Sequence, residues 1–408
     1  MKVLQVNCVF NNNSSTGKLT YALHNFLLSK GDESIVCFGY GDGLNHNGEK
    51  KLCSDYYVKA NHLRARMSGL MYGGCVYSTS KLLSIIKIEK PDIVHLQCIN
   101  GFFINIYRLI SWLKNNKVKT ILTLHADFMF TANCGHALDC TRWEQGCGRC
   151  PNLKKATESF FFDRTAGSWK KMKKAFEGFE KDLTIVSVSP WLMERAMRSP
   201  ILIHMRHLCI YNGLDTSVFY HREMSDFAEQ FMAKDKRNIL CVFNRFTAKK
   251  GDFKGSDKVV ELAKKLEGED VRFIIVGKNI SEVELPSNIR FAGNNISQDM
   301  LAQLYSQADV TMLTSKKETF SMITAESLCC GTPVVGFKSG APERIAVEEY
   351  STFVDQGDTE ALRNAVLDII NRRFDPKEIS KASVDVYSDK KMCGMYFELY
   401  KEIIGEGL

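Results

Sequence analysis

Apolar runs alternate with amphipathic stretches along most of this chain, and the alternation predicts two α/β domains. In the first half the strand-like runs are VLQVNCVF, SIVCFGY, DIVHLQC and KTILTLHA, and in the second NILCVF, VRFIIVG, IRFAG, DVTML and TPVVGF. Helical periodicity separates these runs from one another. Strands that alternate with helices form parallel, doubly wound sheets. The pattern therefore predicts two Rossmann-like domains in succession.

A turn signal at Asn212 and Gly213 marks the junction between the two halves, because a polar stretch and a new first strand follow it. We expect a first domain over residues 1–205, a second over 206–385 and a C-terminal helix over 386–408. Five apolar residues recur at helical spacing in that last segment: Met392, Tyr396, Leu399, Tyr400 and Ile403. The helix should therefore pack against a folded core.

The stretch TSKKETFSMITAESLCCGTPVV, residues 314–335, reads as strand end, loop, helix, loop and strand. A helix that starts near 320–322 offers backbone N–H groups to an anion. Glu318 and Glu326 flank this start and can face one crevice, where carboxylates accept paired hydrogen bonds from vicinal sugar hydroxyls. Taken alone, the two residues could equally be solvated glutamates.

Basic residues follow the first strand of the second half, in NRFTAKKGDFKGSDKVVELAKKL. Arg245 supplies a fork of donors and Lys254 a point charge, a combination suited to holding a diphosphate. A solvated basic loop is the alternative interpretation. Lys250 competes with Lys254 for the same role, but the helical pattern begins directly after Gly255, which favours Lys254.

In the first half, the loop SSTG opens a helix after the first strand, where Gly17 and Lys18 could approach a phosphate or a hydroxyl. An ordinary capped helix start is the alternative. His125 ends the strand-like run of TLHADFMFT, where side chains enter a cleft, and His95 is a weaker candidate of the same kind. A histidine at such a place is often a core residue.

Four cysteines lie within seventeen residues of CGHALDCTRWEQGCGRC: Cys134, Cys140, Cys147 and Cys150. Four thiolates that end in Cys-x-x-Cys complete the tetrahedral shell of a structural zinc ion. We expect such a site, with reduced thiols and a redox pair as alternatives. The other cysteines are scattered through strands and helices, as expected of buried reduced thiols.

These motifs together resemble the donor half of the family 4 retaining glycosyltransferases of GT-B fold. The resemblance rests on Glu318-x7-Glu326, GTPVV, Arg245 with Lys254-Gly255, and NGLD followed by Phe219, and it covers most of residues 205–345. The cysteine segment is similar to an insertion in the branch that builds colanic acid and capsular polysaccharides. Relatives often carry glycine where this chain has Thr319 and Ser321.

The resemblance implies a GT-B fold, with two Rossmann-like domains facing across a cleft and the C-terminal helix packing back on the first domain. It implies that Glu326 binds the ribose, that Glu318 and His125 contact the donor sugar, and that Arg245 and Lys254 hold the diphosphate. Its remaining donor-binding expectations are the amides of Phe320, Ser321 and Met322, the nucleotide pocket at Gly277 and Gly293, and the loop at Gly17 and Lys18.

The implied reaction moves a sugar from a nucleotide-diphosphate donor to a lipid-linked or oligosaccharide acceptor, with retention of configuration. No Asp-x-Asp occurs in the chain, so we expect no donor-bound divalent metal. A sugar-nucleotide hydrolase or epimerase of the same fold is one alternative, and a non-catalytic binding subunit of a polysaccharide assembly complex is another.

The net charge of +7 is modest and demands no nucleic-acid partner. No apolar run approaches the roughly 20 residues that span a bilayer, and the N-terminus reads as a core strand, so we expect a cytoplasmic protein. SWKKMKKAFEGFEK predicts an amphipathic helix with four lysines opposite Trp169, Met172, Phe176 and Phe179. Core packing is the first interpretation of this helix, and peripheral contact with the inner face of the cytoplasmic membrane is the second.

Overall fold

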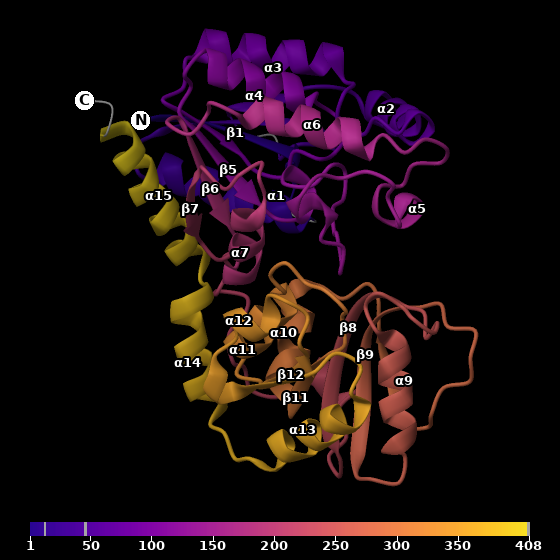
Figure 1. Ribbon diagram of the computed structural model, residues 1–408. Helices are drawn as coiled ribbons and strands as arrows, with labels where there is room; N and C mark the ends of the chain where they lie inside the picture. The colour runs from indigo at the N-terminus through magenta and orange to yellow at the C-terminus, as the bar shows by residue number, and fades with distance from the viewer. Residues whose placement is uncertain (12–13, 45–46, 406–408) are drawn as a thin grey trace. The chain divides into compact units, whose positions relative to one another are not determined.

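The structure is a computed structural model that describes residues 1–11, 14–44 and 47–405, arranged in two compact units (Figure 1). The first unit comprises Met1–Tyr211 together with the C-terminal segment from Met392, and the second comprises Asn212–Lys391. The chain thus passes between units a few residues beyond the expected limits at 205 and 385.

A parallel sheet forms the centre of the first unit. Among the described residues it has seven strands, in the order β3-β2-β1-β4-β5-β6-β7. The strands are β1 (Lys2–Val9), β2 (Glu33–Tyr40), β3 (Glu49–Lys51), β4 (Ile93–Leu96), β5 (Thr120–Leu124), β6 (Leu183–Ser187) and β7 (Arg206–Cys209). Apart from Lys2 at the start of β1, the central strands β1, β4 and β5 are buried, which explains their continuous apolar runs. This is the doubly wound order predicted by the alternating pattern.

Helices connect these strands, as a parallel sheet requires. They are α1 (Ser15–Ser29), α2 (Asp55–Ser68), α3 (Val76–Glu89), α4 (Ile106–Asn115), α5 (Leu153–Ala156), α6 (Thr165–Phe176) and α7 (Pro190–Arg198), with 3-10 turns at Asp127–Met129 and Arg142–Glu144. The amphipathic helix expected over residues 168–181 is α6, and it ends at Phe176 because Glu177 has a non-helical ψ of 124° and Gly178 has φ 81°. Trp169, Met172, Phe176 and Phe179 are buried, whereas the four lysines of the helix are exposed.

The C-terminal helix α15 (Asp389–Gly405) completes the core of the first unit. All five of its predicted apolar positions are buried there, in a cluster that also contains Val3, Leu23 and Ile121. Its tyrosines also reach a buried polar group. Tyr400 OH lies 2.6 Å from His95 Nδ1, and Tyr396 OH lies 2.8 Å from Thr123 Oγ1, which lies 2.8 Å from His95 Nε2. The helix is therefore fixed by both apolar and polar contacts.

The second unit repeats the strand order of the first. Its described strands pair in parallel in the order β10-β9-β8-β11-β12-β13. They are β8 (Arg237–Phe246), β9 (Val271–Asn279), β10 (Ile289–Gly293), β11 (Val310–Leu313), β12 (Val334–Phe337) and β13 (Ser351–Val354). The helices are α8 (Asp226–Glu229), α9 (Ser256–Lys265), α10 (Gln298–Gln307), α11 (Met322–Cys329), α12 (Pro342–Ile345), α13 (Thr359–Asn371) and α14 (Pro376–Tyr387), with a 3-10 turn at Glu348–Tyr350.

The strand order changes side between β8 and β11. From β8 the chain adds β9 and β10 on one side of the sheet, and it then adds β11, β12 and β13 on the other. In doubly wound sheets, ligands bind outside the carboxyl ends of the strands at this switch point. The loops that follow β8 and β11 are therefore the first place to look for a site. No helix within the described ranges is long and apolar enough to cross a membrane.

Candidate functional site

The loops after β8 and β11 bring Lys254 and Glu318 into contact. Lys254 Nζ lies 2.6 Å from Glu318 Oε1. The loops are also joined through the backbone, because Thr314 Oγ1 donates to Lys254 O at 3.0 Å and Lys316 N donates to Phe253 O at 3.0 Å. About half of the lysine side chain stays exposed, against 16% of the glutamate. A ligand can therefore reach the ammonium group without unfolding either loop.

Gly255 fixes the position of Lys254. It has φ 74°, and a Cβ placed there would lie 2.1 Å from Thr314 O, so only glycine allows this close approach of the two loops. Helix α9 begins at Ser256, directly after this glycine, as the sequence predicts. Lys250 lies exposed in the turn before it.

Helix α11 starts where the sequence predicts, with Ser321 as its N-cap. Ser321 Oγ accepts from Thr324 N at 3.3 Å, and the residue has φ 85°, a conformation that favours glycine. Glycine would adopt this backbone without strain, in agreement with the glycine that the resemblance implies at this position. Phe320 is buried and Met322 is half-buried, so the candidate amides belong to a well-packed helix start at the positive end of the helix dipole.

Glu326 lies on α11, and a buried tyrosine orients it. Tyr305 OH, from α10, donates to Glu326 Oε2 at 3.1 Å. Burial and the neighbouring Glu326 carboxylate raise the pKa of Tyr305, which keeps its hydroxyl protonated as a donor. Sequence reasoning missed Tyr305, because an apolar-faced helix gives no sign of which tyrosine turns its hydroxyl toward a distant carboxylate.

The remaining second-unit candidates lie at the carboxyl ends of β8, β9 and β10. Arg245 is exposed near the end of β8, just after a bulge in its pairing with β9. Gly277 has φ 139°, and a Cβ there would lie 2.3 Å from Phe243 O, so the bulge requires glycine. Gly293 has φ 109° and faces open space. The structure thus gathers Arg245, Lys254 and Glu318 at one edge of the second sheet.

Three candidates belong to the first unit. Gly17 lies in the first turn of α1, where its N–H donates to Ser14 Oγ at 3.1 Å and a Cβ would meet Asn11 O. Lys18 follows it in the same turn. His125 directly follows β5, and its Nε2 donates to Gln97 Oε1 at 3.2 Å. Burial lowers the pKa of His125 to about 4, so the ring is neutral at neutral pH.

His95 takes the core role that the sequence left open. It is fully buried, and both of its ring nitrogens have hydrogen-bond partners. Burial and the neighbouring His125 lower the pKa of His95 to about 3. His95 therefore anchors α15 and is not available to a ligand.

The four cysteines of the insertion share one cavity. Cys134, Cys140, Cys147 and Cys150 line a space of about 20 Å³, enough for a single water or ion. Burial raises the pKa of Cys134, and the three nearby thiols raise it further. Across the described ranges, however, no group of three or more His, Cys, Asp or Glu side chains is arranged to hold a metal ion. The thiols share a cavity without forming a coordination shell, and zinc stays a prediction.

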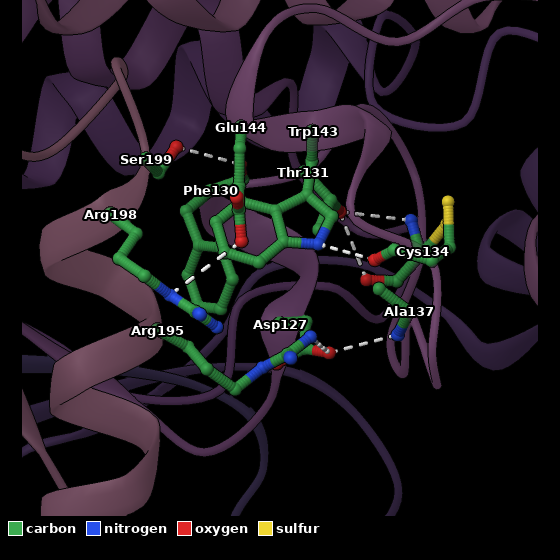
Figure 2. A network of polar contacts seen from close by, with 11 residues as sticks. Asp127, Phe130, Thr131, Cys134, Ala137, Trp143, Glu144, Arg195, Arg198 and Ser199 are labelled. Carbon is green, nitrogen blue, oxygen red and sulfur yellow. Dashed lines mark hydrogen bonds and ion pairs between the residues drawn. The ribbon is translucent and has the colours of Figure 1, made fainter.

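A buried polar network ties this cysteine segment to α7, as Figure 2 shows. Arg195 Nη2 lies 2.9 Å from Asp127 Oδ2, which also accepts from Ala137 N at 2.8 Å. The Arg195 guanidinium stacks over the rings of Trp143 and Trp191, at 5.1 and 4.7 Å from their centroids. Asp127, which follows His125 by two residues, thus serves the segment's architecture.

Further contacts in Figure 2 hold the backbone on either side of the cysteines. Trp143 Nε1 donates to Cys140 O at 2.7 Å, and Thr131 Oγ1 accepts from Cys134 N at 3.1 Å. Ser199 Oγ donates to Phe130 O at 3.0 Å. The segment is therefore an ordered part of the first unit.

Comparison with known proteins relates the second unit to one family. The family described as glycosyl transferases group 1 matches residues 224–385, which lie within the second unit. The chain is 21% identical to the glycosyl transferase WcaC of Escherichia coli K12, named for colanic acid biosynthesis, over 99% of this chain and 100% of that protein. It is 22% identical to the N-acetyl-alpha-D-glucosaminyl L-malate synthase of Bacillus anthracis, over 48% of this chain and 53% of the synthase.

Solved structures agree on the fold. The chain superposes on sucrose-phosphate synthase from Thermosynechococcus elongatus with a TM-score of 0.68, at 15% identity and with complete coverage of both chains. HepE of Anabaena in complex with UDP gives a TM-score of 0.64 at 13% identity, over 98% of this chain and 100% of that one. These neighbours are GT-B glycosyltransferases. The chain therefore has the GT-B fold, and its residues 224–385 match the glycosyl transferases group 1 family.

Proposed function

We propose that this protein transfers a sugar from a nucleotide-diphosphate donor to a lipid-linked or oligosaccharide acceptor in the synthesis of a surface or capsular polysaccharide, with the anomeric configuration retained. The observation that carries the donor class is the contact between Lys254 and Glu318, which joins the loops after β8 and β11 at the switch point of the second sheet. Two relatives support it: WcaC by its name in colanic acid biosynthesis, and HepE by its complex with UDP.

In this proposal the carboxylates bind hydroxyls. Glu326, held by Tyr305, accepts hydrogen bonds from the ribose, and Glu318 accepts from the donor sugar. The two carboxylates have different partners: Glu318 pairs with the ammonium group of Lys254, whereas Glu326 accepts a hydrogen bond from the neutral hydroxyl of Tyr305. This difference suits Glu318 to the sugar next to the phosphates and Glu326 to the ribose. Neither residue needs to act as a proton carrier.

In this proposal, fixed positive groups stabilise the negative charge that develops on the diphosphate as it leaves the sugar. Arg245 and Lys254 supply two cations, and the start of α11 adds the positive end of its dipole. Lys254 already lies within reach of Glu318, so one side chain links the sugar-binding carboxylate to the departing phosphates.

A labelled nucleotide sugar tests the proposal, with and without acceptor lipid. A thermal-shift panel of UDP-, GDP- and ADP-sugars first selects the donor, because a ligand that binds only the folded state raises its stability. Label should then move to lipid only when acceptor is present, and the product should keep the donor's configuration. Release of free sugar at the same rate without acceptor would instead identify a hydrolase, and donor binding without turnover would identify a binding subunit.

A further inference from the structure

Three consecutive phenylalanines lie exposed in the loop before α6. Phe160, Phe161 and Phe162 are 39%, 69% and 51% exposed. Neighbouring rings in this series contact one another edge to face, with centroids 6.0 and 6.3 Å apart. Soluble proteins seldom leave contiguous aromatic groups in water, and such patches mark interaction sites.

Helix α2 extends this apolar surface. Phe160 N donates to Arg66 O at 2.8 Å, which holds the loop against the last turn of α2 in the first unit. Leu63 and Met67 are one turn apart on α2 and more than half exposed. We call the phenylalanine loop together with Leu63 and Met67 the aromatic surface.

Arginines border the aromatic surface at close range. The Arg66 guanidinium lies 4.2 Å from the centroid of the Phe160 ring, and that of Arg164 lies 5.4 Å from the Phe162 ring. Helix α2 carries three basic residues and one acidic residue. Residues 154–174 carry seven basic residues and two acidic ones. Their combined excess of seven positive charges equals the net charge of the whole chain, +7. The chain's positive excess is therefore concentrated in the segments that form and flank this surface.

The acidic residues of these segments are engaged within the protein. Glu158 Oε2 lies 3.3 Å from His62 Nε2. Asp163 accepts from Cys150 N at 2.6 Å, and Asp55 lies at the far end of α2, in its first turn. In contrast, the lysines of α5 and α6 are exposed. Positive charge consequently dominates the solvent-facing groups around the phenylalanines.

We propose that the aromatic surface docks on an anionic lipid bilayer. Phenylalanine and aliphatic side chains enter the headgroup boundary while lysine and arginine stems keep their charges at anionic headgroups. A second copy of this chain is a poor occupant, because two surfaces of the same positive charge repel. A nucleic acid is also a poor fit, since Leu63 and Met67 cannot stack on bases. The proposal goes beyond sugar transfer and does not depend on it.

Co-sedimentation of the full chain with vesicles tests the docking, without donor or acceptor. We expect binding to phosphatidylcholine vesicles that contain about one third phosphatidylglycerol, with little binding to pure phosphatidylcholine or in 0.5 M salt, about three times the physiological level. Phe161→Ser with Phe162→Ser should weaken the partition coefficient about tenfold or more. Ile88→Ser with Ile203→Ser removes two exposed apolar side chains elsewhere in the first unit and should leave it unchanged.

A charge-reversal pair separates electrostatic from apolar attraction. Lys154→Glu with Lys155→Glu should weaken binding by about fivefold or more for each lysine. Arg373→Glu with Lys377→Glu, both exposed in the second unit, is the matched control. Donor-induced thermal stabilisation should be the same in all four variants, which shows that each folds and keeps the second unit's site whether or not transfer is ever detected.

Three results would overturn the proposal. The first is equal binding to anionic and neutral vesicles, or none to either. The second is self-association of the parent protein in sedimentation velocity that disappears in the double serine variant, since this would identify a second copy as the occupant. The third is retention of a single-stranded oligonucleotide that the same variant loses.

Discussion

Replacing Arg195 by methionine should loosen the cysteine segment. The guanidinium lies 2.9 Å from the Asp127 carboxylate, and only 9% and 2% of the two side chains are exposed. Removing one partner of a buried ion pair leaves an uncompensated charge and costs about 3–5 kcal/mol. Ala137 N still donates to Asp127, which places the expected loss near the lower limit, about 3 kcal/mol.

Thiol labelling measures this loss locally, which matters because unfolding of a two-unit chain is not a single transition. Iodoacetamide labelling of the four cavity cysteines, read by mass spectrometry, reports the open population of the segment. A loss of 3 kcal/mol raises that population about a hundredfold. We therefore expect labelling to accelerate by about two orders of magnitude.

Arg198→Met is the matched control on the same helix. Its ion pair with Glu144 spans 3.6 Å, and more than half of the Arg198 side chain is exposed, so its loss should change labelling by less than about fivefold. Adding Asp127→Asn to Arg195→Met removes the stranded charge and should restore part of the protection. Equal labelling rates in the Arg195 and Arg198 variants would refute the assignment of the buried pair as the anchor.

Further predictions concern the second-unit site, the metal and pH. Lys254→Ala should lower the rate of sugar transfer by roughly 10² or more, whereas Lys250→Ala should change it by less than about threefold. Equal losses in the two variants would contradict the assignment of Lys254 alone to the diphosphate. Glu326→Gln should lower kcat/KM by roughly 10², and Tyr305→Phe by about tenfold or less because the carboxylate remains; unchanged activity would end the ribose assignment. Elemental analysis should find about one zinc per chain in the cysteine cavity, and its absence would leave reduced thiols. Burial holds the pKa of His95 at about 3 against an ordinary 6.5, so stability is retained above pH 6.5 and lost as pH falls toward 3. The Tm should fall with acidification over this range, and His95→Gln should flatten the dependence.

The central strands could be predicted from sequence because they are buried on both faces. Every run proposed as a strand becomes one, and the expected start of α11 is correct. The strands that were missed include three edge strands of the two sheets. The strand β3 is Glu49–Lys51, three charged residues that pair with β2, and β7 and β13 lie at the edges beside β6 and β12. Such strands carry no core pattern, because none of their residues is fully buried. The run LTIVS of β6, by contrast, carries a signal that the sequence interpretation overlooked.

The position of a candidate residue could be predicted where a nearby glycine marks the start of a helix. Gly255 shows where α9 begins and so singles out Lys254. Contacts between residues far apart in the chain were not predictable. Tyr305 precedes Glu326 by 21 residues, and Arg195 follows Asp127 by 68. Periodicity assigns each such residue to a buried face, but the partner it meets depends on how the helices pack.

The C-terminal helix also sets the order in which the chain can fold during synthesis. The first unit begins at Met1, but its core includes Met392, Tyr396 and Tyr400. Domains usually fold in the order in which they leave the ribosome. Here the first unit must wait with an open face while the second, which is continuous from Asn212 to Lys391, is made and folds. The C-terminal helix therefore completes the first unit only after the second unit has been made, and a premature stop that removes α15 would expose the N-terminal core.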